Sequence, residues 1–335
     1  MTPDAVVVGA GHNGLVAASV LADAGWSVEI VEAADEPGGA LRSFALEPGF
    51  VSDHCASFFP LGAASPAFRS LDVPWRHGPL VLAHPGRGVL ERGGPWAPRL
   101  VEGCALHTDA NWLTGRLVGA VLLELGRRYG FPCVAGGAGT LTRLLVDRAR
   151  HATFRFGERV DSLPRARRAV ILACDIWEAS RILGRASSVR PDPASLKMDW
   201  TLDGPVPWTF EPARRAPVVH LGGPGRFAIV GQYATADPTR MPAGKEVVWA
   251  YTHDALDLEA LLESHAPGFR SLIRERRVEH MPPGRINGGT MRLLRHGPRL
   301  APGVYLGSMS AFPGGGVHGG PGWIAAQAAL KSARP

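Results

Sequence analysis

The N-terminal end of the chain carries the pattern of a strand, a helix and a second strand. Asp4 to Val8 is a short apolar run that ends at a glycine, which is typical of a buried parallel strand. A helical pattern then continues through Ala24, and Gly25 suits the left-handed conformation that ends many helices. Ser27 to Val31 is the second predicted strand. The pattern therefore predicts a strand–helix–strand unit with a parallel sheet.

Similar patterns recur in the middle and at the end of the chain. Thr140 to Arg150 has apolar residues on one face of a predicted helix, and strands are predicted at Phe154 to Val160 and Ala169 to Cys174. Near the end, a strand is predicted at Gly303 to Gly307 and an alanine-rich helix at Trp323 to Leu330. We expect these segments to complete the sheet that begins at the N-terminus.

The rest of the chain has a different pattern. Two helices are predicted, at Asp257 to His265 and at Phe269 to Arg277. Four apolar runs with turn residues between them predict an antiparallel sheet: Leu196 to Leu202, Val218 to Leu221, Phe227 to Tyr233 and Val247 to Tyr251.

Two sets of apolar residues in this region are candidates for the core or for a pocket. A helix that Gly130 terminates has one apolar face, made of Leu117, Val118, Val121, Leu122 and Leu125. Aromatic residues on strands belong more often to the core than to a pocket, and both interpretations stay open for Trp200, Trp208, Trp249 and Tyr251.

The turn after the first strand has the sequence Gly9-Ala10-Gly11-His12-Asn13-Gly14. In this G-x-G-x-x-G pattern the glycines allow a tight turn, close approach of the backbone to a pyrophosphate, and close packing of helix on strand. Glu32 stands at the end of the second strand, where a carboxylate accepts hydrogen bonds from both ribose hydroxyls of an adenosine. Because that carboxylate would repel a 2′-phosphate, the pattern predicts FAD or NAD and not NADP.

A second glycine pair, Gly38-Gly39, follows six residues beyond Glu32. A nicotinamide dehydrogenase needs no glycine turn there, whereas a flavoprotein does, because side chains would collide with its longer cofactor. Two interpretations stay open for Arg42: it neutralises the pyrophosphate, or it is an ordinary surface arginine. This pair makes FAD the predicted cofactor.

Another side-chain-poor segment lies near the end of the chain. The segment from Gly314 to Gly322 contains six glycines, with both ends included. A flexible loop would explain the glycines, but it would not explain why a strand precedes them and a helix follows.

Several of these segments resemble one family. Val6 to Arg42, Pro48 to Phe68, Lys197 to Trp208 and Asp237 to Tyr251, together with the tail, resemble phytoene desaturases, carotenoid isomerases and related flavin oxidoreductases of the amine oxidase-like superfamily, in particular a bacterial branch. The resemblance implies an α/β fold, in which a glutathione-reductase-like, FAD-binding Rossmann-type domain is combined with a discontinuous α+β substrate domain. In the family, the tail returns to the first domain and its helix N-terminus points at the flavin ring, where N–H groups stabilise negative charge.

The glycine turns and the resemblance together give the candidate cofactor-binding residues. In the family, the strand predicted at Phe154 to Val160 lies against the adenine, which makes Val160 the candidate there. The complete set is Gly9, Gly11, His12, Asn13, Gly14, Glu32, Ala33, Gly38, Gly39, Ala40, Arg42, Val160, Gly307, Gly316 and Val317.

The resemblance also predicts that the chain forms two discontinuous domains. Residues 1–75, 134–185 and 285–335 are predicted to form the FAD-binding domain, and residues 76–133 and 186–284 the substrate domain. The chain is considerably shorter than its relatives, and the connections around Glu91 to Trp112 and Leu221 to Phe227, both in the substrate half, are cut short. The shortening therefore bears on substrate choice and turnover more than on flavin binding.

The function that follows is an FAD-dependent oxidoreductase of the desaturase, dehydrogenase or isomerase type. The resemblance implies an apolar substrate of the polyene or isoprenoid class, with hydride transfer to flavin N5. That chemistry does not require a strong side-chain base, so no catalytic residue is assigned. His54 and His318 are candidates for contact with the ring, and a structural role is an equal alternative for each.

Three alternatives remain open. An NAD-dependent dehydrogenase would explain the first glycine turn but neither Gly38-Gly39 nor the tail. A flavin-free escort or binding protein of the same fold, like the Rab GDP-dissociation inhibitors, would have little need to keep every glycine. A protein that binds FAD without turnover is the third alternative.

The composition limits which partners, metal sites and cellular locations we expect. The net charge is +6, and arginines far outnumber the three lysines, but no nucleic-acid-binding motif accompanies them. Contact with an anionic membrane surface is compatible with this charge. The four cysteines are scattered without metal-ligand spacing, so we expect reduced thiols and no metal site. With no signal-peptide or membrane-span pattern, a soluble cytoplasmic protein is expected, and its oligomeric state stays open.

Overall fold

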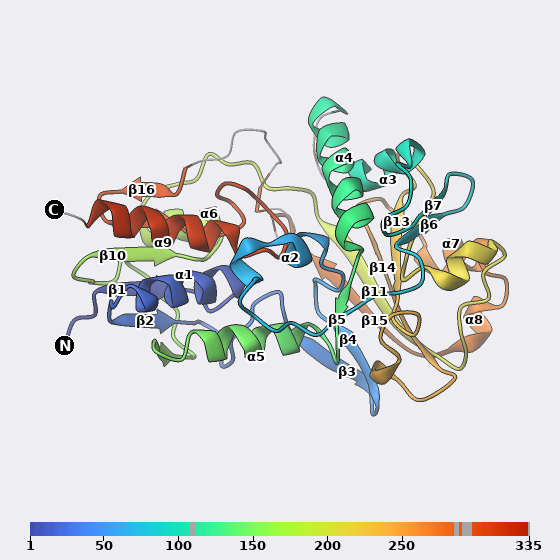
Figure 1. Cartoon of the computed structure of the whole chain (residues 1–335), viewed down its shortest axis with the longest axis horizontal. Helices are drawn as coiled ribbons and strands as arrows, with labels where there is room; N and C mark the ends of the chain where they lie inside the picture. The colour runs from blue at the N-terminus through green and yellow to red at the C-terminus, as the bar shows by residue number, and fades with distance from the viewer. Residues whose placement is uncertain (107–111, 285–287, 290–296, 334–335) are drawn as a thin grey trace.

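The computed structural model describes residues 1–106, 112–284, 288–289 and 297–333 and contains two main β-sheets. The sheets lie at opposite ends of an elongated molecule, and both chain termini lie at the end that holds the first sheet (Figure 1). The predicted third segment of the FAD domain, residues 285–335, is described except for 285–287, 290–296 and 334–335, and the connection at Glu91 to Trp112, which was expected to be short, is described except for 107–111.

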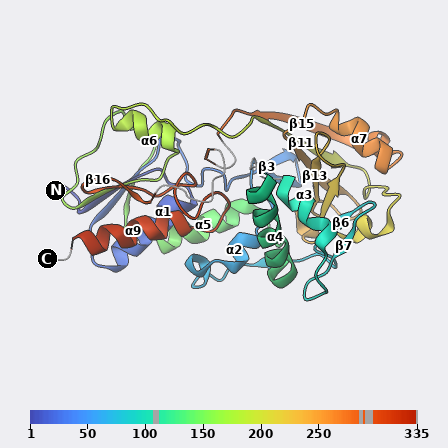
Figure 2. The same cartoon turned by 90° about the horizontal axis from the view of Figure 1, so that it is seen from above.

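The first sheet has six strands, and all its pairs except the β16–β17 pair are parallel. Its alternate residues pack on opposite sides: Ala5 and Val7 pack with helices α1, α5 and α9, whereas Val6 and Val8 pack with α6 (Figure 2). Its strands, in spatial order, are β16 (Arg299–Ala301), β17 (Val304–Leu306), β10 (Ala169–Leu172), β1 (Ala5–Val8), β2 (Val28–Val31) and β9 (Thr153–Arg155). The covering helices are α1 (His12–Asp23), α5 (Ala138–Arg148), α6 (Ile176–Ile182) and α9 (Gly320–Ser332).

The second sheet has seven strands, and all its pairs except β6–β12 are antiparallel. One face packs against α7 and α8, and the other faces α3 and α4. Its strands, in spatial order, are β15 (Ile273–Met281), β11 (Ser195–Leu202), β14 (Glu246–Thr252), β13 (Ala228–Gln232), β12 (Val218–Leu221), β6 (Leu82–His84) and β7 (Gly88–Leu90). The helices are α3 (Val101–Leu106), α4 (Trp112–Tyr129), α7 (Leu258–His265) and α8 (Phe269–Leu272).

Shorter elements join the two sheets. The hairpin of β3 and β4 lies between them and contacts β11, β14 and β15 of the second sheet (Figure 1). These elements are β3 (Ser43–Glu47), β4 (Phe50–Asp53), the β5 (Trp75–Arg76) and β8 (Cys133–Val134) pair, α2 (Pro60–Ala64), and the 3₁₀ turns Pro66–Phe68, Pro98–Leu100, Glu211–Arg215 and Pro238–Arg240. No described helix is long and apolar enough to span a membrane.

The predicted fold class is confirmed, and two predicted elements are wrong. The helix predicted at Phe269 to Arg277 is a single turn, α8, followed by the edge strand β15. Arginine and glutamate favour helices locally, but pairing with β11 decides the conformation, and an edge strand accommodates charged side chains. The strand predicted at Phe154 to Val160 stops at Arg155, because Gly157 takes a left-handed φ of 67°.

A buried polar network fixes the hairpin between the sheets. At the end of β4, the Asp53 carboxylate accepts hydrogen bonds from Ser43 Oγ at 2.6 Å and from the N–H of Ala138, the first residue of α5, at 2.8 Å. Its other oxygen accepts hydrogen bonds from Arg240 Nη1 at 2.7 Å and Tyr233 OH at 3.1 Å. Asp53 therefore bonds to groups from both halves of the molecule.

Arg240 is the cation of this network and is fully buried. Its Nε donates to Asp237 at 3.1 Å, its Nη2 donates to the carbonyl of Val134 at 2.9 Å, and its guanidinium stacks 4.0 Å from the centre of the Tyr233 ring. Burial alone would raise the pKa of Asp237, but hydrogen bonds from Thr239 and the Gly136 N–H, together with the Arg240 charge, lower it. The network therefore holds two carboxylates around one buried arginine.

A second buried acid, Glu246, makes stability depend on pH. Burial raises the pKa of Glu246 to about 7, even though its Oε1 accepts hydrogen bonds from the N–H groups of Tyr233, Ala234 and Val247. Because this pKa exceeds the ordinary 4.5, the protonated acid favours the folded state. Its contribution is complete below pH 4.5 and is lost as the pH rises through 7.

We expect Glu246→Gln to remove this dependence. The amide keeps an oxygen for the three N–H groups and carries no charge, so the variant should gain about 3 kcal/mol relative to wild type between pH 4.5 and pH 8. Melting curves of both proteins at the two pH values measure this gain, with the exposed Glu91→Gln as control. Equal pH dependence in wild type and Glu246→Gln would contradict the assignment.

Candidate functional site

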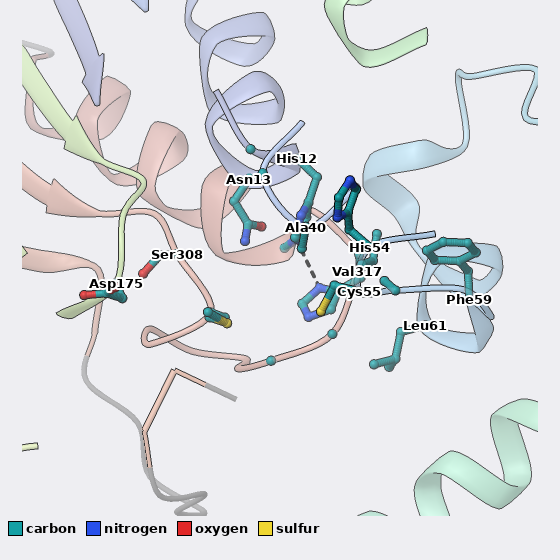
Figure 3. A pocket seen from close by; sticks show the side chains of 18 of the residues that line it. His12, Asn13, Ala40, His54, Cys55, Phe59, Leu61, Asp175, Ser308 and Val317 are labelled. Atoms are coloured by element: carbon teal, nitrogen blue, oxygen red, sulfur yellow. Dashed lines mark hydrogen bonds between the residues drawn. The ribbon is translucent and has the colours of Figure 1, made fainter. Parts of the chain in front are cut away.

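A single cavity of about 1720 Å³ connects the two halves of the molecule. It is lined by both predicted glycine turns, by residues of the tail, and by side chains from β11, β12, β13 and β14 of the second sheet and from α4. Figure 3 shows His12 and Asn13, at the start of α1, together with His54, Cys55 and Val317 among the side chains that line this cavity. The two side-chain-poor segments at opposite ends of the chain thus border one continuous cleft.

Gly11 is the glycine that the motif predicts beside a pyrophosphate. A Cβ at this position would have no protein atom within 4 Å, and Gly11 lines the cavity. Its φ of −71° and ψ of 171° are open to any residue, so the conformation does not demand glycine. The free space beside Gly11 is therefore the space that the motif predicts for a cofactor.

Glu32 is held in place by the backbone of the first turn. Its Oε2 accepts a hydrogen bond from the N–H of Ala10 at 2.6 Å, and its Oε1 accepts one from the N–H of Ala34 at 2.9 Å. Each carboxylate oxygen can accept a further bond, and Glu32 lines the cavity. A fixed acceptor at this point suits the ribose predicted there.

The second glycine turn lies against the first. Gly38 forms a bridge with Gly11, and both Gly38 and Gly39 have left-handed φ values, 121° and 56°. Arg42 lines the cavity, donates from Nε to the Gly39 carbonyl at 3.1 Å, and pairs with Glu36 at 3.3 Å. Both interpretations of Arg42 remain, because it is half exposed and also borders the cavity.

The tail packs directly on the first unit. A Cβ at Gly322 would lie 1.9 Å from the carbonyl oxygen of Asn13, so α9 contacts the start of α1 there. Helix α9 begins at Gly320, three residues before the predicted start at Trp323. The N–H of Gly320 donates to His318 Nδ1 at 3.1 Å, so this first helical N–H is directed at a side chain.

Most of the predicted cofactor-binding residues line the cavity. These are Gly9, Gly11, His12, Asn13, Glu32, Ala33, Gly39, Ala40, Arg42, Val160, Gly316 and Val317. Gly14, Gly38 and Gly307 do not. A Cβ at Gly14 would lie 2.0 Å from the Gly9 carbonyl oxygen, one at Gly38 would lie 3.0 Å from Thr142 Oγ1, and one at Gly307 would lie 2.8 Å from Ile171 Cγ2, so these glycines allow close packing.

Five of the described histidines line the cavity, and burial lowers the pKa of three of them, His12, His54 and His318. Burial lowers the pKa of His12 to about 3, and the neighbouring His318 adds to this effect. Since His318 Nδ1 accepts from Gly320, its Nε2 carries the proton and donates to the Gly314 carbonyl at 3.3 Å. His318 is thus a neutral ring fixed within the tail.

Sequence reasoning left Trp249 and Tyr251 as candidates for a pocket, but it missed Lys197 on the wall that the second sheet contributes. Lys197 is buried on β11, lines the cavity, and donates from Nζ to the carbonyl of Asp53 at 3.0 Å and to Asp199. Trp249 and Tyr251 also line the cavity, whereas Trp200 and Trp208 lie in the core on the opposite face. A buried lysine within an apolar strand was the available signal.

The apolar face of α4 lines the cavity and is only partly covered. Leu117 and Val121 remain 52% and 50% exposed, although Val118, Leu122 and Leu125 lie beside them on the same cavity wall. An apolar helix face usually packs against a core. Here part of it borders open space, so this end of the cavity suits an apolar ligand.

Comparisons with known proteins agree with this fold. Residues 7–72 match the family described as NAD(P)-binding Rossmann-like domain. An oxidoreductase from Methanosarcina mazei superposes with a TM-score of 0.72 at 16% identity, covering 98% of this chain and 99% of that one. Cyclohexylamine oxidase from Brevibacterium oxydans superposes with a TM-score of 0.68 at 15% identity, covering 99% of each chain. Putrescine oxidase bound to putrescine superposes with a TM-score of 0.63 at 14% identity, again covering 99% of each. No curated protein matches the sequence.

Proposed function

We propose that this protein is an FAD-dependent oxidoreductase that acts on an apolar substrate. The observation that carries the proposal is the continuous cavity between the two glycine turns, the tail and the second sheet. Its volume of about 1720 Å³ exceeds the roughly 300–1,000 Å³ of an ordinary small-molecule site. Space for a long cofactor and a substrate together explains this size.

The residues of the first half fit FAD. Glu32 would accept hydrogen bonds from the ribose hydroxyls, and the pyrophosphate would lie in the free space beside Gly11. Gly39, Gly316 and Val317 would border the rest of the cofactor. When bound, FAD supplies a two-electron acceptor for a hydride that leaves a substrate carbon. The protein's own contribution is to align the substrate and to keep water away from it.

The other half favours an apolar substrate. Leu117, Val118, Val121 and Ile229 line that part of the cavity, with Trp249 beside them. The resemblance to phytoene desaturases supports the same class, while the similar structures include proteins named as amine oxidases. The alternatives explain less: an NAD-dependent dehydrogenase leaves the second glycine turn and the tail unexplained, and a flavin-free escort leaves the space beside Gly11 unexplained.

The visible spectrum of the purified protein tests the proposal. We expect the absorption bands of oxidised flavin, and we expect dithionite to bleach them. Anaerobic bleaching by a polyene hydrocarbon would then demonstrate turnover and separate an enzyme from a protein that only binds FAD. A colourless protein that also fails to take up added FAD would refute the proposal.

A further inference from the structure

Helix α4 carries a stripe of exposed apolar side chains. Leu113, Leu117 and Val121 follow one another at intervals of four residues, so they lie on one face of the helix. Their exposed fractions are 66%, 52% and 50%. From the first to the last of them the helix rises by about 12 Å. The α4 stripe, as we call these three residues, is an apolar surface that the fold leaves open.

The stripe leads from the outer surface of the molecule into the cavity. Leu117 and Val121 line the cavity, whereas Leu113, one turn earlier, does not. The N-terminal end of α4 projects beyond the elements around it (Figure 1). An apolar molecule that meets the protein at Leu113 would therefore find further apolar side chains along its way into the cavity.

Two neighbouring helices continue this apolar border. Helices α4 and α2 and the start of α9 follow one another along one side of the molecule in both views (Figure 1, Figure 2), and α2 contacts α4. Their apolar residues on the cavity wall are all at least partly exposed: Leu61 and Ala64 of α2, and Trp323 and Ile324 of α9. Trp323 is 47% exposed, and tryptophan is enriched where proteins meet the surface of a membrane.

The charge around the stripe is positive. Residues 60–134 contain eight arginines and five acidic residues, so this segment supplies half of the net charge of +6. Arg116 is exposed on α4, one residue before Leu117. Further along the helix Glu124 pairs with both Arg127 and Arg128, which leaves one positive charge in that group. Apolar residues with basic neighbours are typical of helices that bind the surface of an anionic membrane.

From these observations we infer that the α4 stripe docks on an anionic lipid bilayer, so that the cavity opens toward the apolar part of the bilayer. Charge distinguishes this partner from a second copy of the chain. Two copies that met symmetrically through the stripe would bring the same basic segments together, whereas anionic headgroups attract those segments. Docking does not depend on flavin. Only the entry of an apolar substrate from the bilayer rests on the proposed function.

Co-sedimentation of the purified protein with lipid vesicles tests the docking. We expect binding to phosphatidylcholine vesicles that contain about 30% phosphatidylglycerol, and binding about tenfold or more weaker to vesicles of phosphatidylcholine alone. Raising the NaCl concentration from about 0.1 M to about 1 M should weaken binding to the anionic vesicles, because the Debye length falls from about 10 Å to about 3 Å.

A double variant separates the stripe from the net charge. Leu113→Gln combined with Leu117→Gln keeps the charge and a similar helix propensity, so the variant should melt like wild type. Its binding to the anionic vesicles should fall about tenfold or more, because two apolar side chains no longer enter the bilayer. The matched control is Leu163→Gln combined with Val278→Gln. These residues are 41% and 49% exposed and lie outside the cavity, so this variant should bind like wild type.

Three results would overturn the inference: wild type that does not bind anionic vesicles, equal binding by wild type and the stripe variant, or equal binding to both kinds of vesicle. Sedimentation velocity without lipid tests for the second copy, and a dimer that dissociates in the stripe variant would also overturn it. The flavin spectrum of the same preparation is recorded separately. A colourless protein that binds vesicles would refute the proposed function alone, and a flavin-containing protein that does not bind them would refute the docking alone.

Discussion

Gly11→Val should yield a folded protein that retains no FAD. The new side chain would enter the space beside the first glycine turn, where no protein atom lies within 4 Å of a Cβ. We expect the affinity for FAD to fall by about 100-fold or more, equivalent to about 2.7 kcal/mol or more. The flavin absorbance of the purified variant, and titration of the apoprotein with FAD, measure the loss.

The apoprotein should tolerate the same change. Gly11 has an ordinary backbone conformation, so valine adds no φ strain, although valine is a poor residue at the N-cap that Gly11 occupies. We expect a cost of about 1 kcal/mol and a melting temperature lower by about 1–2 °C.

Two controls frame the Gly11→Val result. In Gly297→Val the new Cβ also meets open space, but outside the cavity, so FAD binding should not change. In Gly14→Ala the Cβ would lie 2.0 Å from the Gly9 carbonyl oxygen, so this variant should lose stability itself. Normal FAD retention by Gly11→Val would show that the cofactor site has been misplaced.

Local sequence was sufficient for the central strands of the first sheet. The strands β1 and β10 are buried on both faces, so each is a continuous apolar run that stands out from the rest of the chain. Glycine positions were informative for a similar reason: at Gly14, a side chain would collide with backbone. Such constraints act within one turn or one strand, so the local sequence is enough to predict them.

The wall contributed by the second sheet depends on contacts between distant segments. His220 and Lys197 face the same cavity only because β12, β13, β14 and β11 pair in one register, and a slip of one residue would turn either side chain to the other face. No local pattern encodes that register. Strand β15 was missed for the same reason, because its charged residues favour a helix until β11 pairs with them.

The sequence did not predict the contact between the two halves either, although this contact is made of strongly polar residues. In the sequence, Asp53, Asp237 and Arg240 resemble surface charges in turns, and nearly 200 residues separate the first from the last. In the structure, all three are buried and share hydrogen bonds. Such a cluster stabilises the fold only when it is complete. Each carboxylate loses its hydration on burial, and only the ion pair with the arginine compensates for that loss.

Removing that cation should therefore have the largest effect on stability of any single change considered. In Arg240→Met the side chain keeps much of its apolar volume, but Asp53 and Asp237 lose their ion pair and the Val134 carbonyl loses its donor. Breaking a buried pair by removing one partner typically costs about 3–5 kcal/mol. For a chain of this length we expect the melting temperature to fall by about 4–7 °C.

The exposed Arg274 provides the matched control for Arg240→Met. It also joins the hairpin to the second sheet, through Glu47 on β3 at 2.8 Å and Asp203 at 2.9 Å, but its side chain is 37% exposed. Exposed ion pairs contribute about 0–1 kcal/mol, so Arg274→Met should shift the melting temperature by no more than about 1–2 °C. Because Asp53 directly precedes His54 and Cys55 on the cavity wall, Arg240→Met should also weaken FAD retention, whereas Arg274→Met should not. Equal melting temperatures for the two variants would mean that the buried network does not hold the two halves together.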